Sequence, residues 1–171
     1  MKQRNLYLLA GCPGSGKSTW VKNWIENDDA SIIVSRDEIR FSILKDGEDY
    51  FAHEDEVYRI FIQKIQTALE CPLINNIFID ATHLNPKARR KVLNALTVPK
   101  EVKIGCVYFT TPLNICIERN NLREGRAKVP EQVIRNMHSS YVFPTCWKEG
   151  FDMIYEVDEN GIVWEKNEGN E

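Results

Sequence analysis

Short apolar runs alternate with amphipathic stretches along most of the 171-residue chain. Uninterrupted apolar runs predict buried strands at 6–10, 31–34, 76–81 and 103–109. Apolar residues three or four positions apart predict helices over 19–26, 36–44 and about 53–70, and from Pro86, Pro112 and Pro130 onward. This alternation indicates an α/β fold of one domain over residues 1–171, with a mostly parallel sheet covered by helices on both faces.

The last part of the chain has the pattern of a β-hairpin. Apolar runs at 151–157 and 162–164 flank Asn160-Gly161, a dipeptide that favours a tight turn between antiparallel strands. Residues 166–171 are polar, and we expect a disordered tail there.

Composition narrows the class of protein further. Hydrophobic residues make up 43% and charged residues 27%, as in ordinary globular domains, and no apolar run has the length of a membrane span. The first residues lead directly into the first predicted strand, so we expect no signal peptide, and the five cysteines contain no C-x-x-C pair. We therefore expect a cytoplasmic protein with reduced thiols and no membrane contact.

The formal net charge of −3 limits contact with nucleic acid. A protein that follows many phosphates along a duplex is expected to be basic. Any contact with nucleic acid should therefore be local, at an end or a single nucleotide.

The first predicted strand runs into Gly-Cys-Pro-Gly-Ser-Gly-Lys-Ser-Thr at 11–19, the G-x-x-x-x-G-K-[ST] pattern of a phosphate-binding P-loop. Its glycines let backbone amides turn toward an anion, and the following helix adds its positive N-terminus. Lys17 should reach the β- and γ-phosphates, and the Ser18 hydroxyl should bind Mg²⁺. The sequence thus predicts that a nucleoside triphosphate is bound by Gly11, Pro13, Gly14, Ser15, Gly16, Lys17, Ser18 and Thr19.

Polar residues also follow the second strand, at the edge where such sheets bind ligands. Ser35 and Glu38 form a capping-box pattern, so a helix should begin at Arg36. Asp37 and Arg40 then share one face of that helix. The two are either a surface ion pair or an acceptor site, in which Asp37 takes the proton of an attacking hydroxyl and Arg40 holds a phosphate on the acceptor. Their place near the P-loop favours the acceptor site.

Asp80 ends the apolar run 77–79, in the form of a Walker B strand whose aspartate helps to hold Mg²⁺. This residue competes with Asp37 for the role of general base, and spacing alone leaves the two roles open. The three histidines are scattered along the chain, which argues against a metal site built from protein side chains alone.

Arginines are concentrated around the polar stretch 120–128. This stretch is either a solvated loop or a lid that closes over the phosphates and offsets charge in the transition state. We expect a lid, with Arg123 and Arg126 acting in catalysis and Arg119 contacting the nucleotide. A second basic cluster at 87–91 is interpreted as a solvated helix face, with a nucleic-acid contact as the alternative.

Four blocks, at 11–20, 35–40, 80–86 and 119–130, resemble the kinase domain of the phage and bacterial 5′-polynucleotide kinases. That family transfers the γ-phosphate of ATP to the 5′-hydroxyl of RNA or DNA with Mg²⁺. The resemblance implies that Asp37 is the general base, that Arg40 grips the 3′-phosphate of the acceptor and that Thr82 contacts the acceptor strand. We assign the same contact to His83, where the family commonly has Asn. The longer lid leaves Arg123 and Arg126 as alternatives for the lid arginine.

The resulting leading hypothesis is an ATP-dependent kinase acting on a polynucleotide 5′-hydroxyl. The alternative is a P-loop kinase of a small hydroxylated metabolite, nucleoside or antibiotic, which the low basicity favours. A third hypothesis is a binding module switched by nucleotide hydrolysis, in which Asp37 positions water. The preference for RNA or DNA, the acceptor length and the oligomeric state do not follow from the sequence.

Overall fold

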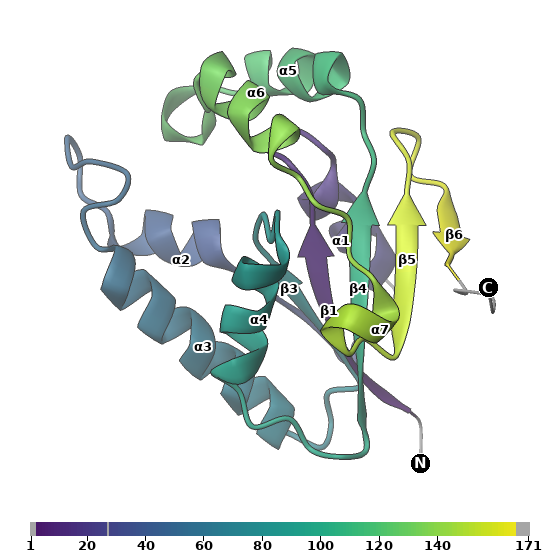
Figure 1. Cartoon of the computed structure of the whole chain (residues 1–171). Helices are drawn as coiled ribbons and strands as arrows, with labels where there is room; N and C mark the ends of the chain where they lie inside the picture. The colour runs from purple at the N-terminus through teal and green to yellow at the C-terminus, as the bar shows by residue number, and fades with distance from the viewer. Residues whose placement is uncertain (1–2, 27, 167–171) are drawn as a thin grey trace.

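Six strands form one sheet within residues 3–26 and 28–166, the part of the chain that this computed structural model describes (Figure 1). The strands are β1 (Arg4–Ala10), β2 (Ser31–Ser35), β3 (Asn76–Asp80), β4 (Val102–Phe109), β5 (Met153–Val157) and β6 (Val163–Glu165). The helices are α1 (Lys17–Ile25), α2 (Arg36–Ile43), α3 (Glu54–Glu70), α4 (Pro86–Asn94), α5 (Leu113–Asn121), η1 (Gly125–Ala127), α6 (Glu131–Ser139) and α7 (Cys146–Glu149).

The strand order is β2-β3-β1-β4-β5-β6, with β1 in the interior of the sheet. Strands β1 to β5 are parallel, and only β6 runs antiparallel, against β5. Leu8 of β1 lies opposite Ile79 of β3 and Cys106 of β4. Because β1 to β4 lie between helical layers, they carry the continuous apolar runs from which they were predicted.

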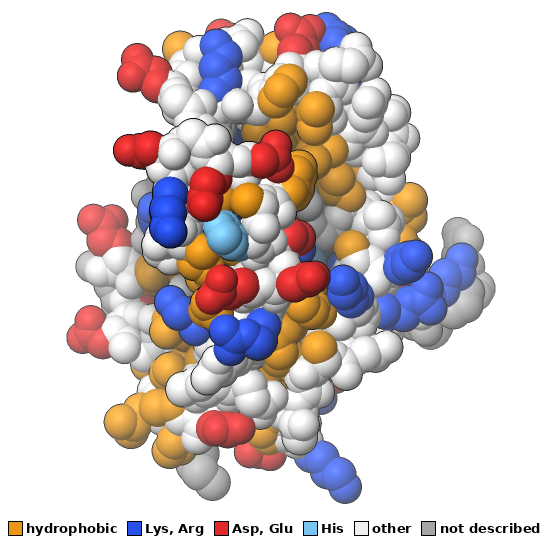
Figure 2. All heavy atoms as spheres, turned by 90° about the vertical axis from the view of Figure 1, so that its left-hand side faces the viewer, with side chains coloured by type: hydrophobic (Ala, Val, Ile, Leu, Met, Phe, Trp, Pro, Cys, Tyr) orange, Lys and Arg blue, Asp and Glu red, His pale blue; other side chains and the backbone are white. Residues whose placement is uncertain are grey.

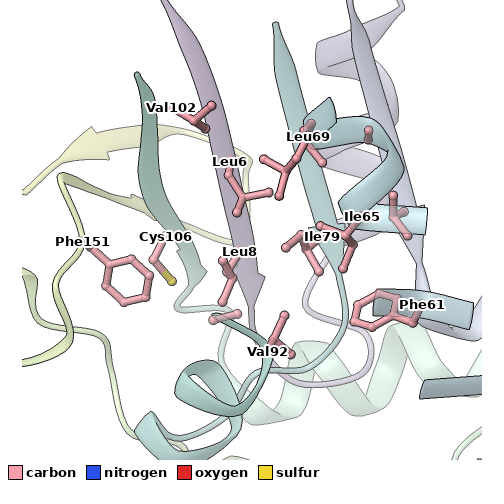
Figure 3. Close-up of a cluster of buried hydrophobic side chains, with 14 of the residues drawn as sticks. Leu6, Leu8, Phe61, Ile65, Leu69, Ile79, Val92, Val102, Cys106 and Phe151 are labelled. Carbon is pink, nitrogen blue, oxygen red and sulfur yellow. The ribbon is translucent and has the colours of Figure 1, made fainter. Parts of the chain in front are cut away.

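Successive residues of each strand point to opposite faces, so the sheet has two cores. On one face, Leu6, Leu8 and Ile79 pack against side chains of α3 that include Phe61, Ile65 and Leu69 (Figure 3). On the other face, Tyr7, Leu9, Phe78 and Phe109 pack against Val21 and Trp20 of α1. Helices therefore cover both faces, as predicted. Figure 1 also shows α5 and α6 beyond the ends of the strands, where Cys12, Leu84, Cys116 and Ile134 form a third cluster.

The hairpin predicted near the C-terminus is present as β5 and β6. Its turn is closed by Asp158, whose backbone amide donates to the Ile162 carbonyl at 3.1 Å and whose side chain accepts from the amides of Asn160 and Ile162. Helix α1 begins at Lys17, two residues earlier than expected, and α7 was not predicted. Of the predicted tail, residues 167–171 lie outside the described part of the chain.

The interpretation of the basic cluster at 87–91 was wrong for Arg89. Its side chain is 0% exposed, and the guanidinium donates to both carboxylate oxygens of Glu149 at 2.7 and 2.8 Å. It also donates to the carbonyls of His83 and Val142. Glu149 lies on the short helix α7, so this buried ion pair ties α4 to a segment 60 residues later. Lys87, Arg90 and Lys91 are exposed, as expected.

No helix in the described residues is both long enough and apolar enough to span a membrane.

Candidate active site

The P-loop connects β1 to α1, and two of its glycines adopt backbone conformations that L-residues avoid. Gly14 has φ 80° and Gly16 has φ 96°, both in the left-handed region. A side chain on Gly14 would overlap the backbone carbonyl oxygen of Cys116 on α5, and one on Gly16 would come within 3.3 Å of the Arg119 guanidinium. The loop is therefore held against α5 by a close approach that only glycine allows.

Lys17 places its ammonium group inside the P-loop. Its Nζ donates to the carbonyls of Gly11 at 2.8 Å and Cys12 at 3.0 Å. Burial lowers the pKa of this amine below its ordinary value, while the negative charge of Asp80 acts in the opposite direction. An anion in the loop would meet a desolvated cation beside the N-terminus of α1, which is a favourable setting for a phosphate.

Four hydrogen bonds join the P-loop and the end of β1 to residues from other parts of the chain. The Thr111 hydroxyl donates to the Ser15 carbonyl at 2.8 Å, and the Tyr141 hydroxyl donates to the Ala10 carbonyl at 2.7 Å. The Gly11 amide donates to the Thr82 carbonyl at 2.9 Å, and the His83 ring binds the Leu9 carbonyl at 2.7 Å. Sequence reasoning missed Thr111 and Tyr141 in this role, because both contacts depend on tertiary packing. Pro13 lies in the loop, and Ser18 and Thr19 lie exposed on the first turn of α1.

The sheet brings Ser18 and Asp80 together, although 62 residues separate them. The Ser18 hydroxyl donates to Asp80 Oδ2 at 2.6 Å. Within the described residues no group of three or more His, Cys, Asp or Glu side chains could hold a metal by itself. A hydroxyl and one carboxylate suit Mg²⁺ nonetheless, since this ion keeps several waters and binds through one or two carboxylates plus substrate phosphates. The pair fits the metal site predicted from the sequence.

Asp37 and Arg40 form a direct ion pair on α2, with Arg40 Nη1 2.5 Å from Asp37 Oδ1. The Ser35 hydroxyl caps this helix by accepting from the Glu38 amide, as predicted. The exposure of the two partners differs sharply: Arg40 is 4% exposed, whereas the Asp37 side chain is 63% exposed. The pair is therefore more than a solvated surface contact, because a fully charged guanidinium is held in the interior beside an accessible carboxylate.

Tyr50 and Glu54 complete this cluster, and sequence analysis missed both. Tyr50 donates its hydroxyl to Asp37 Oδ1 at 2.6 Å and accepts from Arg40 at 2.8 Å. Burial and the bond to Asp37 raise the pKa of Tyr50 above its ordinary value, so its phenol stays protonated as a donor. Glu54 binds Arg40 at 2.7 Å and also pairs with Arg36. The only available signal for Glu54 was its place in the acidic first turn of α3.

The lid segment (residues 121–128) is exposed throughout and carries η1. Its two arginines face different parts of the site. Arg126 donates to the carbonyls of Leu44 and Lys45 at 3.3 and 3.4 Å, at the end of α2. Arg123 lies close enough to the P-loop for its charge to add to burial, the main cause, in lowering the pKa of Lys17. The two residues that the sequence left as alternatives therefore differ in their surroundings, since Arg126 binds the end of α2 and the charge of Arg123 acts on Lys17.

Two hydrogen bonds close the base of the lid segment. The Asn120 side-chain amide donates to the Val129 carbonyl at 2.7 Å and accepts from the Val129 amide at 2.9 Å. Next to it, Arg119 donates to the Glu159 carbonyl at 2.7 Å, which joins α5 to the turn between β5 and β6. Arg119 therefore lies alongside Gly16, on the P-loop side of α5.

His83 does not suit the substrate contact suggested by the sequence. Its ring is 4% exposed, and burial lowers its pKa to about 4, so the imidazole is neutral at neutral pH. Because a carbonyl only accepts, the bond to Leu9 requires the proton on Nδ1. Nε2 is then an acceptor, buried without a hydrogen-bond partner among the described residues. His83 supports β1, in an unusual backbone conformation with φ 42°, while the neighbouring Thr82 is only half-buried.

Comparison with known proteins identifies the family and the fold. A family model described as "AAA domain" matches residues 6–144. A chain of the Pnkp1/Rnl/Hen1 RNA repair complex superposes with a TM-score of 0.69 at 21% identity, covering 99% of this chain and 51% of that one. A fungal RNA kinase has a TM-score of 0.65 at 12% identity, with coverages of 92% and 75%. A gluconokinase from Sinorhizobium meliloti 1021 has a TM-score of 0.57 at 15% identity, with coverages of 92% and 84%.

These similarities confirm the kinase-like P-loop fold that the sequence predicted. At such identities the solved structures show the fold alone, and that fold occurs both in a protein named as an RNA kinase and in one named as a gluconokinase. The chain also spans about half the length of the chain from the RNA repair complex. The acceptor must therefore be argued from the site of this chain.

Proposed function

This chain belongs to the AAA-domain family matched over residues 6–144, whose P-loop kinase members generally use ATP and Mg²⁺, and on that premise we propose that it phosphorylates the 5′-hydroxyl of a polynucleotide end. The observation that carries the proposal is the cluster of Asp37, Arg40 and Tyr50 at the carboxyl edge of the sheet. It presents an accessible carboxylate and a buried cation next to the strand that ends in Asp80.

The nucleotide half of the proposed site consists of the P-loop, Ser18 and Asp80. The β- and γ-phosphates of ATP would lie in the loop, where Lys17 exchanges its bonds to loop carbonyls for bonds to phosphate oxygens. Ser18 and Asp80 would hold Mg²⁺, which neutralises charge on the transferred phosphoryl group. Arg123, whose charge acts on Lys17, would add a second positive charge as transfer proceeds.

The acceptor half consists of the cluster on α2. The two hydrogen bonds that Asp37 makes in the described part of the chain both involve Oδ1, so Oδ2 can accept the proton of a 5′-hydroxyl. Tyr50 and Arg40 fix the orientation of this carboxylate. Arg40 would also attract a phosphate on the acceptor, in competition with Asp37 and Glu54. Arg40 thus gains a positioning role in addition to the phosphate contact that the resemblance implies.

A kinase of a small hydroxylated metabolite is the second candidate. The net charge of −3 and the likeness to a gluconokinase favour it. Such an acceptor would need no phosphate of its own, and Arg40 would then act only on Asp37.

The two candidates are separated by offering γ-labelled ATP with 5′-hydroxyl RNA, 5′-hydroxyl DNA, a nucleoside 3′-monophosphate, a plain nucleoside, gluconate and water. We expect label on the nucleic acids and the 3′-monophosphate, with the plain nucleoside used about 10- to 150-fold less efficiently. That range corresponds to one charge-assisted hydrogen bond of roughly 1.5–3 kcal/mol. Arg40→Ala should remove most of the difference. Equal use of the two monomers, or label only on gluconate, would favour the metabolite kinase.

The positions of the lid arginines predict different kinetic defects. Arg123→Ala should lower kcat by roughly 10²-fold, because it removes charge next to the transferred phosphoryl group. Arg126→Ala should mainly raise the KM of the acceptor, by about 10-fold, because Arg126 lies at the end of α2. Steady-state kinetics with each substrate varied in turn measure both effects. Lys128→Ala, which removes an equal charge from the same exposed segment, serves as the control. Normal kinetics in both arginine variants would show that the segment is only a solvated loop.

A further inference from the structure

Three aromatic side chains lie beside the proposed acceptor cluster, and the proposed chemistry does not use their rings. Phe41 is on α2, whereas Tyr50 and Phe51 are in the connection between α2 and α3. The ring centroid of Tyr50 lies 6.2 Å from that of Phe41 and 4.8 Å from that of Phe51, both in edge-to-face geometry. The three rings are in contact in the order Phe41, Tyr50 and Phe51, and this group is here called the aromatic platform.

Phe51 is unusual within the platform because 64% of it is exposed. The short connection that carries it makes several hydrogen bonds within itself. Glu48 accepts from the Lys45 amide at 2.8 Å and contacts the His53 ring at 3.0 Å, and the Phe51 amide donates to Asp49 at 2.9 Å. Local bonds therefore constrain the backbone that carries the exposed ring, and the ring itself contacts Tyr50. An aromatic side chain exposed to water forgoes the free energy of burial, and a ligand that covers it would recover this energy.

The platform begins one hydrogen bond away from the proposed general base. Tyr50 donates to Asp37, and the Arg40 guanidinium lies 4.3 Å from the centroid of the Tyr50 ring. The Arg126 guanidinium lies 5.9 Å from the Phe41 ring, so the lid segment adds a cation at the edge of the same surface. Figure 2 shows this side of the molecule, on which hydrophobic side chains lie between basic and acidic ones. A ligand on the platform would be close to both the reacting carboxylate and the lid.

We propose that the aromatic platform stacks the nucleobase of the acceptor nucleotide, with Phe51 as the main contact. This inference rests on the proposed function and specifies which part of the acceptor is recognised. A terminal nucleotide carries a planar base a few bonds from its 5′-hydroxyl, whereas a sugar acid has no aromatic face. Stacking on an aromatic side chain contributes roughly 1–3 kcal/mol per base and tolerates any sequence. Such recognition also suits an acidic protein that contacts only the end of a strand.

The test compares two 5′-hydroxyl oligonucleotides that differ only in their first nucleotide, one normal and one abasic with a tetrahydrofuran sugar. With the normal acceptor, Phe51→Ala should raise KM about 5- to 150-fold and leave kcat nearly unchanged. With the abasic acceptor the same variant should change KM less than about twofold. Phe51→Trp should restore the preference for a base, while Phe51→Leu should not, although both preserve an apolar side chain.

Two controls isolate the role of the ring. Trp164→Ala removes an exposed aromatic residue from β6, at the opposite edge of the sheet from β2, and should leave both KM values unchanged. Tyr50→Phe retains the ring but loses the bond to Asp37, so it should lower kcat and preserve the discrimination between the two acceptors. Thermal melts should show all Phe51 variants folded, because the side chain is largely outside the core.

Calorimetry measures directly whether the parent enzyme binds the two oligonucleotides. Together with the kinetics it shows whether a negative result overturns the platform proposal alone or the proposed function as well. If the parent enzyme phosphorylates both acceptors and Phe51→Ala has the same KM values as the parent, the platform proposal is wrong and the proposed function stands. An equal rise in both KM values would also overturn stacking. If the parent enzyme neither binds nor phosphorylates any nucleic acid but labels a metabolite, the proposed function fails and the platform proposal fails with it.

Discussion

Replacing Lys17 with alanine is expected to lower phosphoryl transfer by roughly 10²–10³-fold while leaving the protein folded. That is the scale on which removal of one preorganised donor to a transition state acts. Within the described residues the ammonium group makes its hydrogen bonds to the P-loop itself, through the carbonyls of Gly11 and Cys12 and the Ser15 hydroxyl. Its loss therefore removes a ligand for phosphate without opening the core. The measurement is the transfer rate from γ-labelled ATP at saturating acceptor, with circular dichroism as the test of folding.

Lys22→Ala is the matched control for this variant. Lys22 lies on the same helix, 62% exposed, and its 3.7 Å contact with Glu38 is a surface ion pair of small energetic value. It should transfer phosphate at the parent rate. Parent-like turnover in Lys17→Ala would instead mean that this loop does not bind the nucleotide.

Asp37→Asn is expected to lower turnover by roughly 10²-fold or more with no change in the affinity for ATP. General acid–base catalysis contributes on this scale, and a side-chain amide cannot take up the proton of the acceptor hydroxyl. Asparagine has nearly the same shape and retains one oxygen for the bonds from Arg40 and Tyr50. The variant therefore tests the chemistry of the carboxylate. Single-turnover transfer and nucleotide binding, measured on the same preparation, separate the two effects.

Asp80→Asn provides the comparison that assigns the two aspartates. Asp80 is bound to Ser18, so its variant should need more Mg²⁺ and regain turnover as the Mg²⁺ concentration is raised. If instead Asp80→Asn stays inactive at saturating Mg²⁺ and Asp37→Asn has normal turnover, the roles of base and metal ligand must be exchanged.

The conformation of the P-loop, the nucleotide half of the proposed site, was predictable from the sequence because its determinants are local. A strand, a glycine-rich loop and a helix follow one another at 4–25, and the positive φ angles of Gly14 and Gly16 arise within that stretch. The cap at Ser35 is equally local, since the hydroxyl binds an amide three residues later. The acceptor half was only partly predictable. Tyr50 reaches Asp37 from a loop without periodicity, and only the packing of α3 against α2 brings Glu54 to Arg40.

Arg89 illustrates a signal that was present and misread. It lies three residues before Val92, so the helical period places it on the face of α4 that packs on the sheet. Its charge made a solvated position the natural interpretation. The compensating carboxylate, Glu149, belongs to a helix of four residues, which is too short to produce a recognisable periodic pattern. Buried charge is therefore hard to predict when its partner comes from a distant, irregular part of the chain.

The bonds between Asn120 and Val129 have a consequence for the entropy of the lid segment. They join residues nine positions apart, so the entropic cost of closing this loop is already part of folding and does not arise again when a ligand binds. Ordering the segment over a nucleotide would then cost only the conformational entropy of the residues between Asn120 and Val129. This cost is about 1–2 kcal/mol for each residue whose backbone becomes fixed. Doubling the length of such a closed loop would add only about 0.6 kcal/mol of closure entropy. Insertions into the segment should therefore cost little stability, provided that the two hydrogen bonds between Asn120 and Val129 are retained.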